Sequence, residues 1–307
     1  MTRSAWDRFW ANERAGRSGG CLAEGPPALK AAQRQFWQGI ARSLPRAGRV
    51  LDLATGDGVV MSWLIAARPD LKPFGIDLSP HIPKPPKGCR VRGGISMEAL
   101  PVEAESQDAV VSQFGVEYGD LPRVVAEIDR VLKKGGRVGL MTHRADGPIV
   151  EFNRHRRAGL AWALDDAKLI EKARAGLSVR HMGFGLPPAI ASGPNEGAAR
   201  FGTGSAAWEF AETVRQTLTR TEGKTDEAVL SMLALLERKA RDEIERIDEL
   251  EAASAVASDG VTIETLFAER GLELQSSGPL REAGGARPAA DIWMLRKPIG
   301  PTGSLRA

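Results

Sequence analysis

The chain has 307 residues, of which 42% are hydrophobic and 26% are charged, and its formal net charge is +3. This composition is that of an ordinary globular protein long enough for one elaborated domain or two small ones, and the charge is too small to demand a nucleic-acid partner. Two distant cysteines, four scattered histidines and the absence of a long apolar run predict a reduced cytoplasmic protein without a structural metal or a membrane span.

The first half of the chain is predicted to alternate strands and helices. The segment 79–88 is too rich in proline for a normal helix. Gly135-Gly136 is expected to end the helix predicted over 121–133. The predicted elements are a helix at 27–44, a strand at 49–54, a helix at 58–68, strands at 73–77, 89–92 and 108–113, a helix at 121–133 and a strand at 137–142.

The second half is predicted to be mostly helical until the end of the chain. Residues 145–258 are expected to hold one helix over 149–176, a Gly- and Pro-rich loop over 183–204 that is mobile or ligand-dependent, and a helix over 206–220. The longest helix is expected over 225–256, with Thr225 and Asp226 as its cap, and its apolar face packs either in an intrachain bundle or in a subunit seam. A helix at 262–270 and strands at 272–276 and 291–296 complete the prediction.

An acidic turn follows the first predicted strand. It runs from Asp52 to Gly58, and a second apolar run ends about twenty residues later in Asp77. A dinucleotide site favours G-x-G-x-x-G, because the start of a helix must approach a pyrophosphate. Here Asp57 would place a carboxylate against that pyrophosphate. S-adenosylmethionine (SAM) carries a cationic sulfonium and an amino group instead, and these suit an acidic turn.

Five segments, taken in their order along the chain, resemble the class I SAM-dependent methyltransferases. Within that family, the resemblance is strongest to the ubiquinone- and menaquinone-biosynthesis C-methyltransferases. The segments are Val50 to Gly58, the acid Asp77, Ser96 to Pro101, Gln107 to Gly115 and Leu121 to His143. The resemblance implies a Rossmann-like α/β fold, namely a seven-stranded sheet with a final antiparallel hairpin and a helical insertion between the fifth strand and the last helix. The expected domains are a SAM-binding core formed by 1–144 and 259–307, with an N-terminal helical lid, and the insertion 145–258 as substrate cap or oligomerisation element.

The resemblance also implies which residues bind SAM. Ala54 replaces the usual first glycine, and Ser96 replaces the acid or amide that reads the adenine amino group. Trp6 and Trp10, one helical turn apart, are expected either to cover the cofactor or to pack on the sheet. The expected cofactor-binding residues are Asp52, Ala54, Gly56, Asp57, Gly58, Asp77, Leu78, Ser96, Met97, Gln113 and Phe114.

Candidate catalytic residues follow the fourth and fifth predicted strands. A general base is needed only if the acceptor atom is protonated at neutral pH. Glu117 and Tyr118 follow the fourth strand, and His143 follows the fifth. A basic stretch begins at His143 and could hold an anionic substrate or form one charged helix face.

Three functions remain open from the sequence: a methyltransferase for a small-molecule acceptor, an RNA or protein methyltransferase, and a non-catalytic interaction module. Residues 151–260 hold fifteen Lys and Arg against eighteen Asp and Glu, so the insertion is unsuited to tracking phosphates. Nucleic acid is therefore a poor candidate partner, and the small-molecule acceptor is the favoured prediction. The long helix leaves a homodimer through the insertion open.

Overall fold

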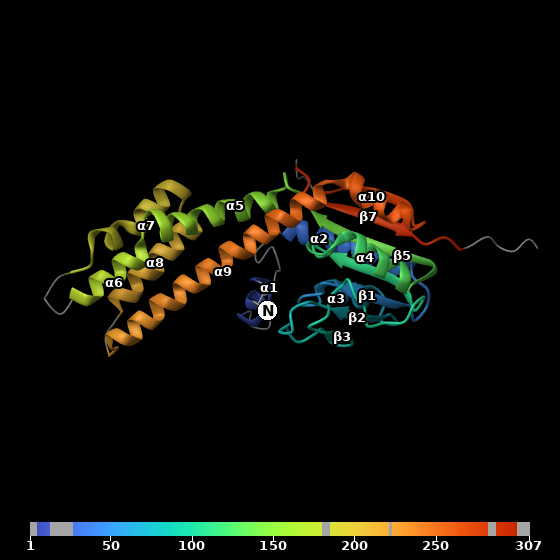
Figure 1. Cartoon of the computed structure of the whole chain (residues 1–307), viewed down its shortest axis with the longest axis horizontal. Helices are drawn as coiled ribbons and strands as arrows, with labels where there is room; N and C mark the ends of the chain where they lie inside the picture. Colours follow the sequence, from blue (N-terminus) through green and yellow to red (C-terminus); the bar gives the residue numbers. More distant parts are fainter. Residues whose placement is uncertain (1–4, 13–26, 180–184, 221–222, 282–286, 300–307) are drawn as a thin grey trace, which may run out of the picture. The chain divides into compact units, whose positions relative to one another are not determined.

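The computed structural model describes residues 5–12, 27–179, 185–220, 223–281 and 287–299 (Figure 1). The chain divides into two compact units. Unit 1 comprises Met1–Val150 and Glu249–Ala307, and unit 2 comprises Glu151–Asp248.

Unit 1 is built on a seven-stranded sheet with the order β3-β2-β1-β4-β5-β7-β6 (Figure 1). The strands β1 to β5 pair in parallel, whereas β7 is antiparallel to both β5 and β6. The predicted sheet and its final antiparallel hairpin are thereby confirmed. The strands are β1 (Arg49–Leu53), β2 (Lys72–Ile76), β3 (Arg90–Arg92), β4 (Gln107–Gln113), β5 (Leu132–His143), β6 (Glu273–Leu280) and β7 (Ala290–Arg296).

Helices cover both faces of this sheet, because buried strand residues alternate between the two sides. On one face, Val50 and Val111 pack with side chains of α2 (Pro27–Ser43) and α3 (Val59–Ala67). On the other face, Leu51 and Val110 pack with α4 (Leu121–Val131) and α10 (Gly260–Glu269). The short helices α1 (Ala5–Asn12) and η1 (Val116–Tyr118) complete the described part of unit 1 outside the helices that it shares with unit 2.

The junction between α4 and β5 differs from the prediction. The helix ends at Val131 and the strand begins at Leu132, so Gly135 and Gly136 lie inside the strand and do not cap the helix. Gly135 adopts a positive φ of 77°, and its N–H donates to the carbonyl of Lys297. Pairing with the segment after β7 therefore extends the sheet where the sequence alone indicated a helix stop.

Unit 2 consists of helices, and two of them differ from the prediction. The single helix expected over 149–176 is interrupted after a π-turn by Lys168, which has φ +51°. The segment expected as a loop over 183–204 instead holds the helix Pro188–Phe201; residues 183–184 lie outside the described residues. The elements are α5 (Pro148–Ala161), η2 (Trp162–Asp166), α6 (Leu169–Val179), α7 (Pro188–Phe201), α8 (Ala206–Thr219) and α9 (Asp226–Ser258).

Close packing explains why α7 is a helix despite its glycines and its internal Pro194. A proline inside a helix costs about 3 kcal/mol, but Pro194 is buried, as are Gly193 and Gly197 on the same helix. Gly197 lets the α8 backbone approach closely, since a Cβ there would lie 3.1 Å from the carbonyl carbon of Ala207. Tertiary packing thus outweighs the poor helix propensity of this segment.

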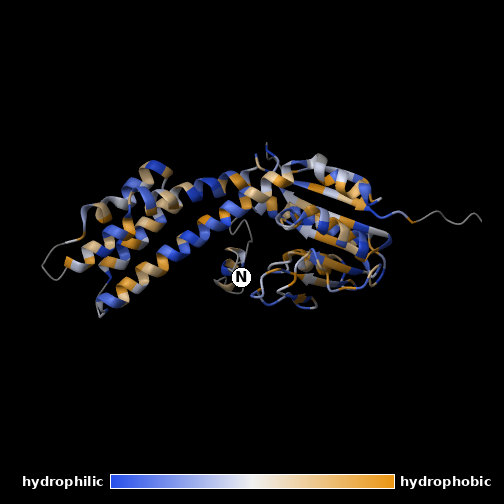
Figure 2. Cartoon of the chain, in the orientation of Figure 1, coloured by the Kyte–Doolittle hydropathy of each residue, from blue (hydrophilic) through white to orange (hydrophobic). Residues whose placement is uncertain are grey.

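Helix α9 is amphipathic, with hydrophilic and hydrophobic residues alternating along its length (Figure 2). The hydroxyl of Thr225 accepts a hydrogen bond from the N–H of Ala228, which confirms the predicted cap. Val229, Leu233 and Ala240 are buried in the core of unit 2. This face therefore packs within the chain, the first of the two alternatives left open by the sequence. In the described part of the chain, no helix has the length and apolar character to cross a membrane.

Candidate functional site

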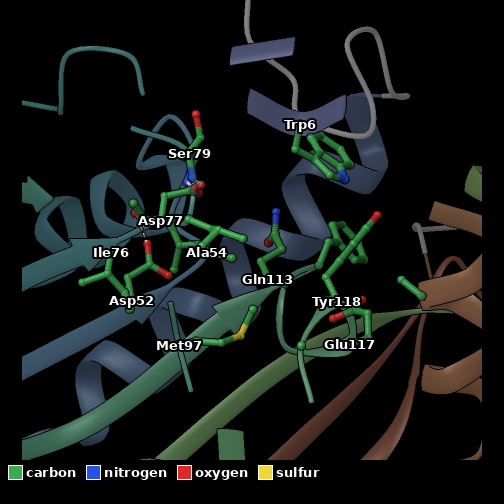
Figure 3. A pocket seen from close by; sticks show the side chains of 18 of the residues that line it. Trp6, Asp52, Ala54, Ile76, Asp77, Ser79, Met97, Gln113, Glu117 and Tyr118 are labelled. Atoms are coloured by element: carbon green, nitrogen blue, oxygen red, sulfur yellow. Dashed lines mark hydrogen bonds between the residues drawn. The ribbon is translucent and has the colours of Figure 1, made fainter. Parts of the chain in front are cut away.

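The carboxyl ends of the parallel strands open into a cavity of about 690 Å³ in unit 1 (Figure 3). Ligands of open α/β sheets bind at this edge, and the volume is typical of a small-molecule site. All the predicted site residues except Gly58 and His143 line the cavity. These are Asp52, Ala54, Gly56, Asp57, Asp77, Leu78, Ser96, Met97, Gln113, Phe114, Glu117 and Tyr118.

The turn after β1 has a left-handed backbone. Ala54 and Gly56 both have φ +51°. For Ala54 this conformation costs about 1–2 kcal/mol, which gives a physical reason for glycine at this position in the resembling family. Gly58, at φ +75°, precedes α3 and packs against Pro86, so it shapes the turn without reaching the cavity.

Asp52 is a buried carboxylate beneath this turn. Its Oδ2 accepts a hydrogen bond of 2.6 Å from the hydroxyl of Thr55. Burial raises the pKa of Asp52 from 3.8 to about 7; the Thr55 hydrogen bond opposes the rise, and the charges of Asp57 and Asp77 add to it. The site therefore holds a carboxylate that a cationic ligand would help to ionise.

Asp77 lies at the end of β2 and joins two loops. Its Oδ2 accepts from the N–H of Gly56 and its Oδ1 accepts from the N–H of Ser79, both at 2.9 Å. Burial raises the pKa of Asp77, and these two backbone hydrogen bonds oppose that rise. A carboxylate has about four acceptor positions, so lone pairs remain for a ligand hydroxyl.

Apolar side chains and a serine flank Asp77. Leu78 lines the cavity although its side chain is 63% exposed, and Ile95 and Met97 line the same region. The hydroxyl of Ser96 accepts from the N–H of Glu98 at 3.1 Å, so the Ser96 hydroxyl hydrogen is directed elsewhere. This end of the cavity can hold a flat, mostly apolar ring beside a hydroxyl-bearing group.

The exit of β4 is tightly packed. Phe114 has φ +56°, and its N–H donates to the carbonyl of Met141. A Cβ on Gly115 would lie 2.5 Å from the Cβ of Ala54, so only glycine lets the two strand exits pass. The indole of Trp37 donates to Gln113 Oε1 at 2.6 Å and thereby fixes this amide.

Glu117, Tyr118 and His143 are brought together beside the cavity. Glu117 Oε1 accepts from the backbone N–H of His143 at 3.0 Å, and His143 Nδ1 lies 2.9 Å from the same oxygen. The His143 ring is completely buried and stacks on Phe114, with 4.3 Å between the ring centroids. His143 thus lies behind the cavity wall, whereas Glu117 and Tyr118 form part of it.

Most arginines of the basic stretch that begins at His143 form ion pairs within their own unit. Arg144 pairs with Asp146 and Asp291, and Arg156 pairs with Glu243. These contacts fit a charged surface rather than an anion site. Within the described residues, no group of three or more His, Cys, Asp or Glu side chains could hold a metal ion.

Residues 51–140 match the family model described as a methyltransferase domain. The chain carries a class I SAM-dependent methyltransferase domain. Among curated relatives, the ubiquinone/menaquinone biosynthesis C-methyltransferase UbiE of Syntrophotalea carbinolica is 42% identical over 105 residues, which are 31% of this chain and 44% of that protein. The malonyl-[acyl-carrier protein] O-methyltransferase of Methylococcus capsulatus is 30% identical over 41% of this chain and 50% of that protein. This chain thus matches about half the length of these relatives or less.

Among solved structures, the comparison finds a chain of the complex between the Haloferax volcanii Trm112 methyltransferase activator and a methyltransferase. It is 15% identical, covers 97% of this chain and 100% of that chain, and has a TM-score of 0.45.

The methyltransferase cavity fits SAM on its own geometry. Asp77 keeps acceptor positions for ribose hydroxyls, and the exposed Leu78 offers an apolar surface to adenine. Asp52 and Asp57 line the cavity near the turn, where cationic groups of SAM would be stabilised. Figure 3 shows Asp52, Asp77 and Ser79 on one side, Glu117, Tyr118 and Trp6 on the other, and Gln113 between them.

Trp6 and Trp10 on α1, which the sequence left between covering the cofactor and packing on the sheet, line the cavity, and a Cβ on Gly56 would lie 2.5 Å from the Trp10 ring. Other lining residues of the methyltransferase cavity were not predicted as site residues. Gln33 on α2 also lines the cavity, and a polar residue on the apolar face of that helix could have indicated this from the sequence. The C-terminal part of α9 also contributes four lining residues, namely Glu249, Ala252, Ala253 and Val256, for which the sequence holds no local signal.

Proposed function

We propose that this chain transfers a methyl group from SAM to a small-molecule acceptor bound in the same cavity. The observation that carries the proposal is one cavity of about 690 Å³ that is lined both by the residues expected to bind SAM and by a separate polar group, Glu117. Bound SAM supplies the electrophilic methyl group. The protein supplies binding, orientation and exclusion of water.

The proposed roles at the cofactor end follow from the hydrogen bonds. Asp77 would accept from the ribose hydroxyls, while the N–H groups of Gly56 and Ser79 hold its carboxylate in place. Leu78 and Met97 would enclose the adenine, and Ser96 would reach its polar edge. Asp52 and Asp57 would face the cationic groups.

At the other end, aromatic rings and Glu117 would position the acceptor. Trp6 and Tyr118 pack edge to face with 5.7 Å between their ring centroids. Holding the acceptor atom against the methyl group in a dry site supplies much of the acceleration, since proximity can contribute about 7–11 kcal/mol. Glu117 would accept a proton when the acceptor atom carries one.

We further propose that α1 is the lid of this site and that the insertion serves the acceptor. Asp7 on α1 accepts a hydrogen bond from the Ser79 hydroxyl at 2.9 Å, next to Asp77. The last turns of the insertion include Glu249 and Val256, which line the cavity.

Calorimetry with SAM and S-adenosylhomocysteine tests the proposal, with Asp77→Ala as the matched variant. We expect micromolar binding by the wild type and a loss of at least about tenfold in the variant. A folded wild type that binds neither compound would refute the proposed function.

A further inference from the structure

The walls of the cavity carry an excess of negative charge. Among the described residues that line it, six are carboxylates and Lys30 is the single cation. The carboxylates are Asp52, Asp57, Asp77, Glu98, Glu117 and Glu249. SAM carries two cationic groups and one carboxylate, so its binding offsets only part of this charge. An anionic acceptor would meet like charges in a space of low dielectric constant.

One carboxylate oxygen in this cavity needs a donor. Glu117 has a fully buried side chain, and its Oε2 makes no hydrogen bond to any described residue. Its Oε1 is held by the backbone N–H and the Nδ1 of His143, at 3.0 and 2.9 Å. A buried carboxylate is costly unless it is paired, so a ligand that brings a cation or a donor to Oε2 is strongly favoured.

The other two carboxylates outside the cofactor end are already engaged. Glu98 accepts from the N–H of Asp120 at 2.9 Å and pairs with Arg123 at 3.5 Å. Glu249 Oε1 accepts from the N–H of Ala5 at 3.4 Å. Glu117 is therefore the carboxylate best placed to select the acceptor.

Aromatic rings surround this group. Tyr118 follows Glu117 directly, the Trp6 ring lies 5.7 Å from the Tyr118 ring, and Phe114 lines the same cavity. Aromatic faces attract ammonium groups, and the attraction grows when water is excluded. A carboxylate beside such rings is a suitable environment for an amine.

We infer that the acceptor is a small apolar amine whose nitrogen is bound by Glu117 Oε2. The inference rests on the proposed function. Glu117 takes a proton from the ammonium group and becomes a neutral carboxylic acid, which leaves the lone pair on nitrogen. The nitrogen forms a bond to the methyl carbon as the carbon–sulfur bond breaks, and the electron pair of that bond stays on sulfur. The products are a methylated ammonium ion and S-adenosylhomocysteine, and the proton on Glu117 passes to water before the next turnover.

The test uses three probes with one aromatic body and different head groups: phenethylamine, 2-phenylethanol and 3-phenylpropionate. Each is titrated by calorimetry into the full chain saturated with S-adenosylhomocysteine. We expect the amine to bind at least about tenfold more tightly than the alcohol, and the carboxylate not to bind. Transfer of an isotope-labelled methyl group to the amine, followed by mass spectrometry, is the second measurement.

The variant Glu117→Gln should lose the preference for the amine while its affinity for S-adenosylhomocysteine stays within about threefold of the wild-type value. Glu264→Gln, which changes an exposed carboxylate of α10 that does not line the cavity, is the matched control and should keep the preference. Equal binding of the alcohol or the carboxylate, absence of amine binding at millimolar concentration, or an unchanged preference in Glu117→Gln would each overturn the inference. Failure of S-adenosylhomocysteine to bind the wild type would instead refute the proposed function.

Discussion

Replacing Asp52 by asparagine should stabilise the protein at alkaline pH and leave its stability nearly unchanged at acidic pH. Asparagine has the same shape, and its side-chain oxygen can still accept the Thr55 hydrogen bond, which is 2.6 Å long in the wild type. The substitution therefore removes the ionisable group from a buried position and little else.

The magnitude follows from the pKa of Asp52, which burial raises from 3.8 to about 7. This rise corresponds to about 4 kcal/mol. The folded protein binds the proton more tightly than the unfolded chain does, so the stability contributed by protonated Asp52 is fully present below pH 3.8 and is lost as the pH rises to about 7. Asp52→Asn has no such loss, and the difference between the two proteins should reach about 4 kcal/mol, or roughly 10 °C in Tm, above pH 7.

Thermal unfolding of the two proteins without ligand, measured from about pH 4 to pH 8, gives the comparison. Asp166→Asn, which changes an exposed carboxylate, is the control and should follow the wild type at every pH. A difference in Tm between Asp52→Asn and the wild type that is the same at both ends of the range would refute the reasoning. SAM affinity in the wild type should also rise across this range, because a cationic ligand favours the ionised carboxylate, and it should be nearly flat in Asp52→Asn.

Three further changes test the packing of the site. Asp77→Asn keeps one acceptor oxygen for two backbone N–H groups, so calorimetry should show S-adenosylhomocysteine affinity reduced by at least about tenfold; near-wild-type affinity would contradict the proposed role. Gly115→Ala places a methyl group 2.5 Å from its nearest neighbour and should cost about 1–3 kcal/mol in denaturant unfolding, whereas Gly39→Ala, with nothing within 4 Å, should not destabilise. Gly56→Ala should lower Tm through contact with Trp10, and Trp10→Ala in that background should recover part of the loss; strictly additive effects would exclude the contact.

The sheet of unit 1 could be predicted because its signals are local and repeated. Parallel strands such as β1 and β4 contain a short apolar run, and the polar residues that follow the strands, such as Asp77 and Glu117, are brought to one edge by the parallel topology. The helix Pro188–Phe201 could not be predicted in this way, because it depends on the fit of Gly197 against Ala207 and not on its own propensity. The start of β5 likewise depends on a distant partner, the segment at Lys297.

The sequence indicated an N-terminal lid and an insertion as substrate cap or oligomerisation element, but not which residues of these two distant segments meet beside the cavity. Ala5 on α1 and Glu249 on α9 are 244 positions apart, yet they share a hydrogen bond of 3.4 Å beside the cavity. No spacing or periodicity encodes such a contact. At Ala54 the sequence showed that alanine replaces the usual glycine. It did not show that this residue has a positive φ of 51°.

The pairing of β5 with β7 has a consequence for the synthesis of this protein on the ribosome. β5 ends at His143, whereas its neighbour in the sheet begins at Ala290, so the whole insertion must be translated in between. At about 5–20 residues per second, this takes roughly 7–30 seconds. Throughout that interval the nascent sheet ends in the 12-residue β5, an unpaired edge of the kind that recruits other chains. Yield in cells should therefore depend on the speed of translation across 144–289 and on chaperones that cover this edge.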